Sequence, residues 1–173
     1  MKYLVVIDMQ YDFVSGSLGT AEATAILENV KNKIGTYHKD PVNCRILYTQ
    51  DTHHEQYLNT QEGRYLPVEH CVKGTNGWEI VKELLVPEAE IIEKPAFGSL
   101  ELAERIATTG DVESIELIGV CTDICVISNA LILKARFPEV PISVDARCCA
   151  GVTPESHEKA LATMRMCQID VQE

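Results

Sequence analysis

Long hydrophobic runs and an excess of positive charge are both missing from this sequence. No apolar segment approaches the roughly 20 residues needed to span a bilayer. The 15 Lys and Arg residues are outnumbered by 26 Asp and Glu residues, which gives a net charge of −11. Nucleic acids and anionic membrane surfaces repel so acidic a protein, so neither is expected as a partner. This charge does not exclude a small neutral substrate.

A signal peptide and paired C-x-x-C motifs are also absent, and this bears on the cellular compartment and on the state of the cysteines. The first residues, MKYLVVIDMQ, do not resemble a signal peptide, because a charged residue follows the apolar run almost at once. The seven cysteines include no paired C-x-x-C spacing, which argues against a zinc-structural protein. An odd number of cysteines without a signal peptide fits free thiols in a reducing compartment. We therefore expect a cytoplasmic protein.

The apolar runs that are present are short and rich in β-formers. A chain of 173 residues suits one well-packed domain, so residues 1–173 are expected to form a single domain. The runs lack polar alternation, which indicates strands buried on both faces. They lie at Tyr3–Ile7, Arg45–Tyr48, Ala89–Ile92, Ile115–Gly119 and Ile142–Val144, with a weaker run at Ile169–Val171.

Helical patterns separate these predicted strands. Apolar stripes run from Ala23 to Ile34 after the N-cap candidate Thr20, over Ile80–Leu85, from Leu100 to Ile106 after Ser99, over Val126–Ala135, and from the helix-opening pair Thr153-Pro154 onward. Strand–helix alternation within one domain predicts a parallel sheet with helices on both sides. The expected fold class is α/β, a three-layer α/β/α arrangement with a mostly parallel, Rossmann-like central sheet.

Polar side chains follow several of these strands at the point where each one ends. Ligands of an open parallel sheet bind beyond the carboxyl ends of its strands, so these residues are the candidates for chemistry. They are Asp8 after the first strand, Asp51 and His53 after the second, Glu93 and Lys94 after the third, Cys121, Thr122, Asp123 and Cys125 after the fourth, and Asp145 after the fifth.

Cys125 is the candidate nucleophile. It lies where a helix is expected to begin, and a helix N-terminus favours the thiolate. Lys94 could favour the thiolate further, and Asp8 could act as a general base that takes the thiol proton. The plainer alternatives are a small buried cysteine, a surface lysine and an aspartate in a turn. That buried apolar role is the one expected for Cys44, Cys148, Cys149 and Cys167.

Asp51, His53 and His70 are the candidate metal ligands. Alternate strand positions point Asp51 and His53 the same way, and one oxygen with two imidazoles suits Zn²⁺, Fe²⁺ or Mn²⁺. The segment Asp51–Gly77, which contains His70, is polar, lacks periodicity and is long for a routine connection. A metal would explain why such a loop is ordered. The alternative is that both histidines belong to an ordinary surface loop.

Six segments of the chain resemble, in order, the isochorismatase-like cysteine hydrolases, and among them the nicotinamidases. LVVIDMQYDF is similar to the family's D-x-Q-x-D-F signature, IIEKPAFGSL to its lysine block, and GVCTDICV to its nucleophile block. YTQDTHH and LPVEHCVKGTNGWEI resemble its two metal-binding blocks, and DARCCAGVTPESHEKAL its block after the fifth strand. The resemblance covers nearly the whole chain.

This resemblance implies an amidohydrolase acting on linear amides. Its catalytic triad would be Asp8, Lys94 and Cys125, and the cysteine would form a thioester as ammonia leaves. The resemblance also implies a cis peptide between Val120 and Cys121, with the backbone N–H groups of Cys121 and Cys125 forming an oxyanion hole. Nicotinamide, hydrolysed to nicotinate, is the implied substrate, which would place the enzyme in NAD metabolism and the salvage of pyridine nucleotides.

The resemblance further implies a divalent metal, most often zinc, with iron or manganese as alternatives, that holds the pyridine nitrogen. Asp51, His53 and His70 match three ligands, and a fourth would come from His54, Glu55 or Glu62, with Glu62 favoured because it lies nearer His70 in the sequence. Nicotinamidases often have an aromatic residue shortly before the His70 equivalent, whereas this chain reads RYLPVEH. Leu66 or Tyr65 would then line the ring opposite Phe13, with Val120 as a further contact.

Two other functions stay open at this stage. One is hydrolysis of another small amide or ureido compound, whose enzymes in this family generally lack the metal site. The other is a non-catalytic binding member of the fold, against which the presence of all three triad residues argues. The resemblance also suggests a homodimer or a larger homo-oligomer.

Overall fold

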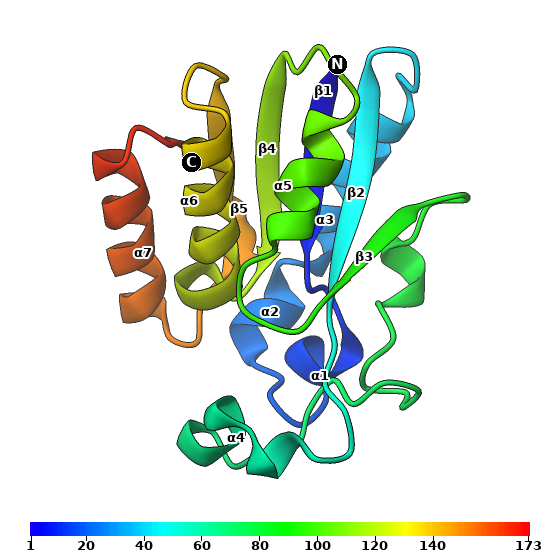
Figure 1. The fold of residues 1–173 in the computed structure, drawn as a ribbon, viewed down its shortest axis with the longest axis vertical. Coiled ribbons are helices and arrows are strands. Elements are labelled where there is room, and N and C mark those ends of the chain that lie inside the picture. Colours follow the sequence, from blue (N-terminus) through cyan, green and yellow to red (C-terminus); the bar gives the residue numbers. More distant parts are fainter.

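A six-stranded, entirely parallel sheet forms the centre of the molecule. The structure, a computed structural model, describes residues 1–173. The strand order is β3-β2-β1-β4-β5-β6 (Figure 1). The strands β2 and β3 therefore lie on one side of β1, and β4, β5 and β6 lie on the other. The strands are β1 Lys2–Ile7, β2 Cys44–Asp51, β3 Glu90–Lys94, β4 Ser114–Val120, β5 Ile142–Ala150 and β6 Asp170–Gln172.

Several of the helices begin at a residue whose side chain caps the first turn. The side chain of Thr20 accepts from the N–H of Ala23, Ser99 accepts from Leu102, and Thr153 forms a capping box with Ser156. The helices are α1 Tyr11–Val14, α2 Ala21–Ala25, α3 Leu27–His38, α4 Gln61–Tyr65, α5 Leu100–Ala107, α6 Ile127–Arg136 and α7 Pro154–Met166, with shorter turns at Tyr57–Asn59, Lys82–Leu84 and Thr122–Val126.

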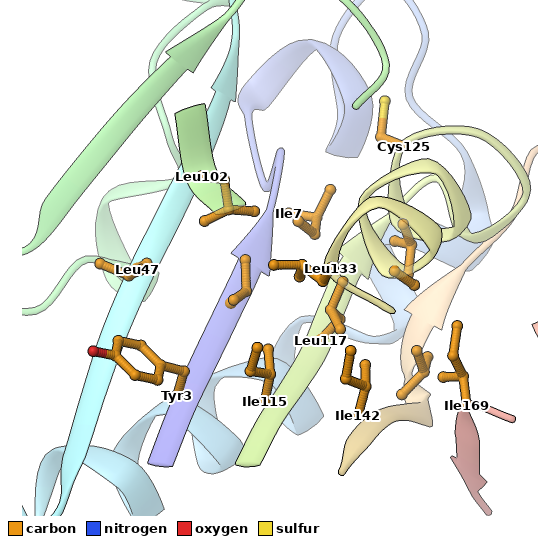
Figure 2. Packing of buried hydrophobic residues seen from close by; sticks show 14 of the residues in the cluster. Tyr3, Ile7, Leu47, Leu102, Ile115, Leu117, Cys125, Leu133, Ile142 and Ile169 are labelled. Atoms are coloured by element: carbon orange, nitrogen blue, oxygen red, sulfur yellow. The ribbon is translucent and has the colours of Figure 1, made fainter. Parts of the chain in front are cut away.

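Helices cover both faces of the sheet, which confirms the predicted three-layer α/β/α fold. On one face, α5, α6 and α7 pack through buried residues such as Leu102, Leu133 and Met164 against the side chains of the strands (Figures 1 and 2). On the other face, α3 packs through Val30 and Ile34. Each face therefore has its own hydrophobic core, and the sheet residues are buried by both.

Several predicted elements differ from those observed. The stripe at Ile80–Leu85 forms only a 3-10 turn, Lys82–Leu84, although Ile80, Val81 and Leu84 are buried as the stripe suggested. The pattern from Ala23 to Ile34 is divided at Ile26 into α2 and α3. In both segments the apolar residues still pack in the core, although neither segment forms one continuous helix.

The fifth strand is longer than the sequence pattern predicted. β5 continues to Ala150, with a register shift against β4 between Leu117 and Gly119. Asp145 therefore lies within the strand and not at its carboxyl end. Its carboxylate pairs with Lys33 Nζ at 2.8 Å and with the Arg147 guanidinium at 2.9 Å. Asp145 belongs to a structural ion-pair network, because α3 and β5 supply its partners.

The connections at the carboxyl ends of the strands make up the lower part of the molecule in Figure 1, where α1 and α4 lie. The connections after β1 and after β4 run to opposite sides of the sheet, so the topological switch point lies between these two strands. Open α/β sheets bind ligands at this position. None of the helices combines the length and apolar character that crossing a bilayer requires.

The Asp145 network makes a testable contribution to stability. Burial alone would raise the pKa of Asp145, but Arg147 and Lys33 lower it from 3.8 to about 2. Because the folded-state pKa lies below the unfolded value, the stabilisation is complete above pH 3.8 and is lost as the pH falls toward 2. We expect Asp145→Asn to lower the free energy of unfolding at pH 7 by about 2 kcal/mol, at about 1.4 kcal/mol per pKa unit.

Urea unfolding of both proteins at a series of pH values measures this difference. The gap between Asp145→Asn and the wild type should narrow below pH 4, as the wild-type carboxylate takes up a proton. Glu139→Gln, which removes an exposed carboxylate without an ion-pair partner, is the matched control and should change stability little. A gap that stays constant down to the lowest pH at which the proteins fold would contradict the electrostatic explanation.

Candidate active site

Four adjacent strands bring the candidate residues to one edge of the sheet. Lys94 ends β3 and is paired in register with Asp51, which ends β2. Asp8 follows β1, and Cys121 follows β4. Since these strands are neighbours in the order β3-β2-β1-β4, the residues stand side by side in the order Lys94, Asp51, Asp8 and Cys121. Figure 2 shows Cys125 beyond the end of β1, close to Ile7.

Lys94 is the centre of this arrangement. Its side chain is almost completely buried, at 1% exposure. Its Nζ lies 2.7 Å from Asp8 Oδ2, 3.3 Å from Asp51 Oδ1 and 3.6 Å from Cys125 Sγ, and it donates a hydrogen bond of 3.0 Å to the carbonyl of Ala96. The three N–H groups of the ammonium thus have enough acceptors around them. Through these contacts Lys94 forms one buried cluster with Asp8 and Cys125, the other two residues of the predicted triad.

Asp8 is held in a left-handed backbone conformation, with φ of 48°, which is uncommon for a residue with a side chain. Thr49 in β2 donates to Asp8 Oδ1 at 2.6 Å, and its hydroxyl also accepts from the Asp8 N–H at 3.2 Å. The other carboxylate oxygen, Oδ2, has no partner except the Lys94 ammonium. One oxygen therefore fixes the carboxylate, and the second is free to exchange a proton.

The electrostatics of the cluster correct one expectation. Cys125 was expected to be predisposed to the thiolate, but burial and the charge of Asp8 raise the pKa of its thiol well above the usual value, and Lys94 opposes this only in part. Burial also raises the pKa of Asp8, against the lowering effect of Lys94. The nearby carboxylates raise the pKa of Lys94 despite its burial. These effects favour the thiol form of Cys125, so a nearby base would assist its attack on a substrate.

The segment that carries Cys125 begins differently from the expected α-helix. Thr122–Val126 forms a π-helical turn that leads into α6, so Cys125 is inside the turn and not at an α-helix N-terminus. The Val120–Cys121 peptide bond is cis, as the family resemblance implied. Among the backbone hydrogen bonds outside regular elements, none uses the N–H of Cys121, which leaves this donor available.

Gly119 allows β4 to approach β1 at the start of this turn. Its φ is +119°, and a Cβ atom at this position would lie 2.1 Å from the carbonyl oxygen of Ile7. Only glycine fits so close to the neighbouring backbone. Gly119, the first residue of the GVCTDICV block, therefore allows the end of β4 to lie against the end of β1, next to Asp8.

Asp51, His53 and His70 form a second cluster next to the first. Their ligand atoms all lie within 4.8 Å of one another, and all three residues are buried. His53 Nε2 is 2.9 Å from Asp51 Oδ2, and His70 Nε2 is 3.6 Å from the same oxygen. Glu62 on α4 faces both imidazoles, with its Oε1 at 3.5 Å from His53 and 3.7 Å from His70. His54 and Glu55, the other fourth-ligand candidates, are exposed.

The residues of this cluster fit a divalent metal. Two carboxylate oxygens, Asp51 Oδ2 at 2.9 Å and Glu62 Oε1 at 3.5 Å, converge on the buried His53 Nε2, which makes no well-aligned hydrogen bond to either of them. A divalent ion between these atoms would satisfy all of them. The Nδ1 atom of His70 lies 2.8 Å from the carbonyl of Val68, an arrangement that leaves Nε2 as the ligand atom. Two imidazoles and carboxylate oxygens are a donor set that suits zinc, iron and manganese.

Gln10 has a part in this site that the sequence did not indicate. Its buried side chain donates to the carbonyl of Asp51 at 2.8 Å and accepts from the N–H of Asp51 at 2.7 Å. It also donates to the carbonyl of Trp78. Gln10 therefore ties the segment after β1 to the backbone of a candidate metal ligand. The D-x-Q motif contained this residue, but only the pairing of β1 with β2 indicates its contacts.

A cavity of about 640 Å³ opens above both clusters. Asp51, Glu62 and His70 line one part of it, and Cys121 and Cys125 line another. The rest of the lining is mostly apolar: Phe13, Leu18, Tyr65, Leu66, Ala96, Phe97, Ile124 and Val152 with the polar Thr20 and Gln61. A largely apolar cavity with a few convergent polar groups is the usual form of a small-molecule site.

The expected substrate contacts differ in their positions. Phe13, Leu66 and Tyr65 all line the cavity, and the rings of Phe13 and His70 are 5.5 Å apart between centroids. Tyr65 is otherwise exposed and stands at the rim. Val120 is not among the lining residues: it is 1% exposed and packs in the core beneath the α3 face of the sheet. Its side chain faces that core because β4 alternates between the two faces.

The fold is that of the isochorismatase-like hydrolases, and the sequence matches the model of the Isochorismatase domain over residues 2–173. An isochorismatase family protein of Bacillus subtilis named PncA is 30% identical over 183 residues, covering 93% of this chain and 92% of that protein. A nicotinamidase of Acinetobacter baylyi is 27% identical over 160 residues, which is 74% of this chain and 72% of that enzyme.

The chain belongs to the isochorismatase family. Among solved structures, the pyrazinamidase of Pyrococcus horikoshii in complex with zinc is 30% identical, with a TM-score of 0.86 over 99% of both chains. The family expected from the sequence motifs is therefore confirmed, and the matched relatives include nicotinamidases and pyrazinamidases.

The orphaned nitrogen of His53 predicts how metal binding should respond to mutation. We expect His53→Ala to weaken zinc binding by at least about 100-fold, because removal of a ligand should cost no less than removal of its supporting contacts. His54→Ala, which changes the exposed neighbouring histidine, is the matched control and should bind zinc like the wild type. Competition with a chromophoric chelator measures both affinities. Equal zinc affinity in the two variants would contradict this ligand assignment.

Proposed function

We propose that this protein hydrolyses a small carboxamide, with nicotinamide as the favoured substrate, to the acid and ammonia through a cysteine thioester. The observation that carries the proposal is the position of Lys94, whose ammonium lies between the Asp8 carboxylate and the Cys125 thiol at the base of an apolar cavity. A nucleophile, a base and a fixed cation in one cluster support covalent catalysis on an amide.

In the first half of the reaction, Asp8 takes the thiol proton of Cys125 as the sulfur attacks the amide carbon. The raised pKa of Asp8 brings its basicity closer to what this transfer requires. The proton moves within the cluster, so the buried charge does not change in total. The backbone N–H groups of Cys121 and Cys125 would stabilise the oxyanion, a type of interaction worth about 100-fold or more per donor.

In the second half, Asp8 returns that proton to the leaving nitrogen and ammonia departs. The carbon–nitrogen bond breaks as the carbonyl re-forms, which leaves the acyl group on the Cys125 sulfur. Water, deprotonated by Asp8, then attacks the thioester carbon, and the sulfur leaves with the proton held by Asp8. Lys94 keeps its position throughout, and its charge stabilises whichever of Asp8 or Cys125 carries the negative charge.

Asp51, His53 and His70, with Glu62 facing them, would hold a divalent metal, with zinc favoured. When bound, the metal supplies a Lewis acid that can anchor a substrate nitrogen. Asp51, His70 and Phe13 all line the cavity, and the Phe13 ring packs beside the His70 ring, so an aromatic ring bound near the metal site could stack on Phe13. These contacts favour a flat heteroaromatic amide over an extended one.

The proposal predicts the effect of removing the sulfur. We expect Cys125→Ala to abolish ammonia release, because Cys125 carries the thiol that lies beside the Lys94 ammonium and would form the thioester. Cys121→Ala should lose far less activity, since its proposed contribution comes from the backbone N–H, which alanine keeps. Cys167→Ala, at the far end of α7, controls for general effects of cysteine removal. Ammonia release from nicotinamide is measured, with circular dichroism as the test of folding.

Substrate identity is tested by the same assay with nicotinamide, pyrazinamide and several ureido compounds, each with and without chelator. Preference for the two heteroaromatic amides, together with loss of activity in chelator, is the expected result. Wild-type activity in Cys125→Ala would overturn the proposed nucleophile. A preference for ureido compounds that chelator does not affect would favour the alternative substrate class.

A further inference from the structure

Asn129 is a buried polar residue for which the reaction described above has no role. It lies one helical turn after Cys125, on α6, and its side chain is completely inaccessible to solvent. The surrounding helix positions, such as Val126, Ala130 and Leu133, belong to the hydrophobic core. Burying a carboxamide in an apolar core costs free energy unless its N–H and C=O groups are hydrogen-bonded. The hydrogen-bond partners of Asn129 therefore indicate its role.

All of the partners of Asn129 belong to the backbone of two catalytic segments. Its Nδ2 donates to the carbonyl of Cys125 at 2.8 Å and to the carbonyl of Phe97 at 3.1 Å. Its Oδ1 accepts from the N–H of Ser99 at 2.9 Å. Both amide hydrogens and the oxygen are therefore used. One contact holds the nucleophile, and the other two hold the loop that follows Lys94.

That loop also determines where Lys94 is placed. Lys94 Nζ donates to the carbonyl of Ala96, which is next to Phe97 in the chain. The loop lies flat on α6: a Cβ atom at Gly98 would come within 2.5 Å of the Ile132 side chain. No regular element connects this loop to the turn of Cys125. The Asn129 side chain thus provides a direct link between the backbone segments that carry the ammonium and the thiol.

We propose that Asn129 is a positioning residue that sets the separation between Lys94 and Cys125 by joining the loop at Phe97 and Ser99 to the backbone of Cys125. The inference rests on the proposed function, because it concerns the geometry of that reaction. Asn129 does not line the cavity, so it acts through its partners and not on the substrate. A displacement of about 1 Å in such a site can cost about 100-fold in rate.

Two variants test this role. Asn129→Asp keeps the shape and the acceptor for Ser99 but cannot donate to the two carbonyls. Asn129→Ser is uncharged, and its hydroxyl can bond the Cys125 carbonyl one turn back but is too short to reach the loop. We expect both to lower kcat by about 10- to 100-fold. KM should change less than about twofold, because ground-state contacts with the substrate are unchanged.

A second measurement does not depend on the substrate. Lys94 lowers the pKa of the Cys125 thiol, so loosening their contact should shift the pH inflection of iodoacetamide alkylation upward in Asn129→Ser. Asp145→Asn is the control for lost stability, because it lies far from the cavity and should keep the wild-type kcat and inflection. The shift in Asn129→Ser must therefore exceed any change seen in that control.

The outcomes separate the two proposals. Lowered kcat with a shifted inflection supports positioning by Asn129. Wild-type kcat and inflection in both Asn129 variants, with only a loss of stability, would show that the residue is structural and overturn the inference. If the wild type released no ammonia from any amide tested, the proposed function would fail, and the alkylation inflection of Asn129→Ser would still decide whether Asn129 positions Cys125.

Discussion

A buried ammonium group is the constraint on which the rest of this active site depends. Removing a charge from water costs several kcal/mol unless partners replace the lost hydration. Lys94 meets this requirement with Asp8, Asp51 and the carbonyl of Ala96, all within 3.3 Å. Asp8 follows β1, Asp51 ends β2, and Ala96 follows β3. These partners can surround Lys94 Nζ only because the three strands end at the same level of the sheet. The same atom lies 3.6 Å from Cys125 Sγ, which brings the nucleophile into the arrangement.

Asp51 links this cluster to the candidate metal site. Its Oδ1 faces Lys94, and its Oδ2 faces His53 and His70. A single carboxylate thus belongs to both sites, and its backbone is held by Gln10 from the segment that also carries Asp8. A shift of Asp51 would change its contact with the Lys94 ammonium and its contacts with the imidazoles of His53 and His70. The two sites are therefore best regarded as one network that shares the Asp51 carboxylate.

The sequence predicted the elements of this network better than the contacts within it. Asp8, Asp51 and Lys94 could be placed at one edge because buried strands end just before or at them, and parallel strands share a direction. The contacts of Thr49, Gln10 and Asn129 could not be predicted, because they depend on which strands pair, in which register, and on how a loop lies against α6. The thiolate expectation failed for a related reason. Position in the chain suggested a helix dipole, whereas burial and the charge of Asp8 have the larger effect on the pKa of Cys125.

The charges of the network also bear on what it can hold. Asp8 and Lys94 balance each other, and Cys125 is neutral as a thiol, which leaves the carboxylates of Asp51 and Glu62 without a full cationic partner. Imidazoles bind a metal in their neutral form, so as ligands they would not change that sum. Two negative charges beside an apolar cavity are costly, and one divalent cation would balance them. The charge of the site thus favours a divalent ion over a monovalent one, and it does so independently of the ligand geometry. In the proposed reaction, a proton transfer from Cys125 to Asp8 would leave this balance unchanged, because both groups belong to the same buried cluster.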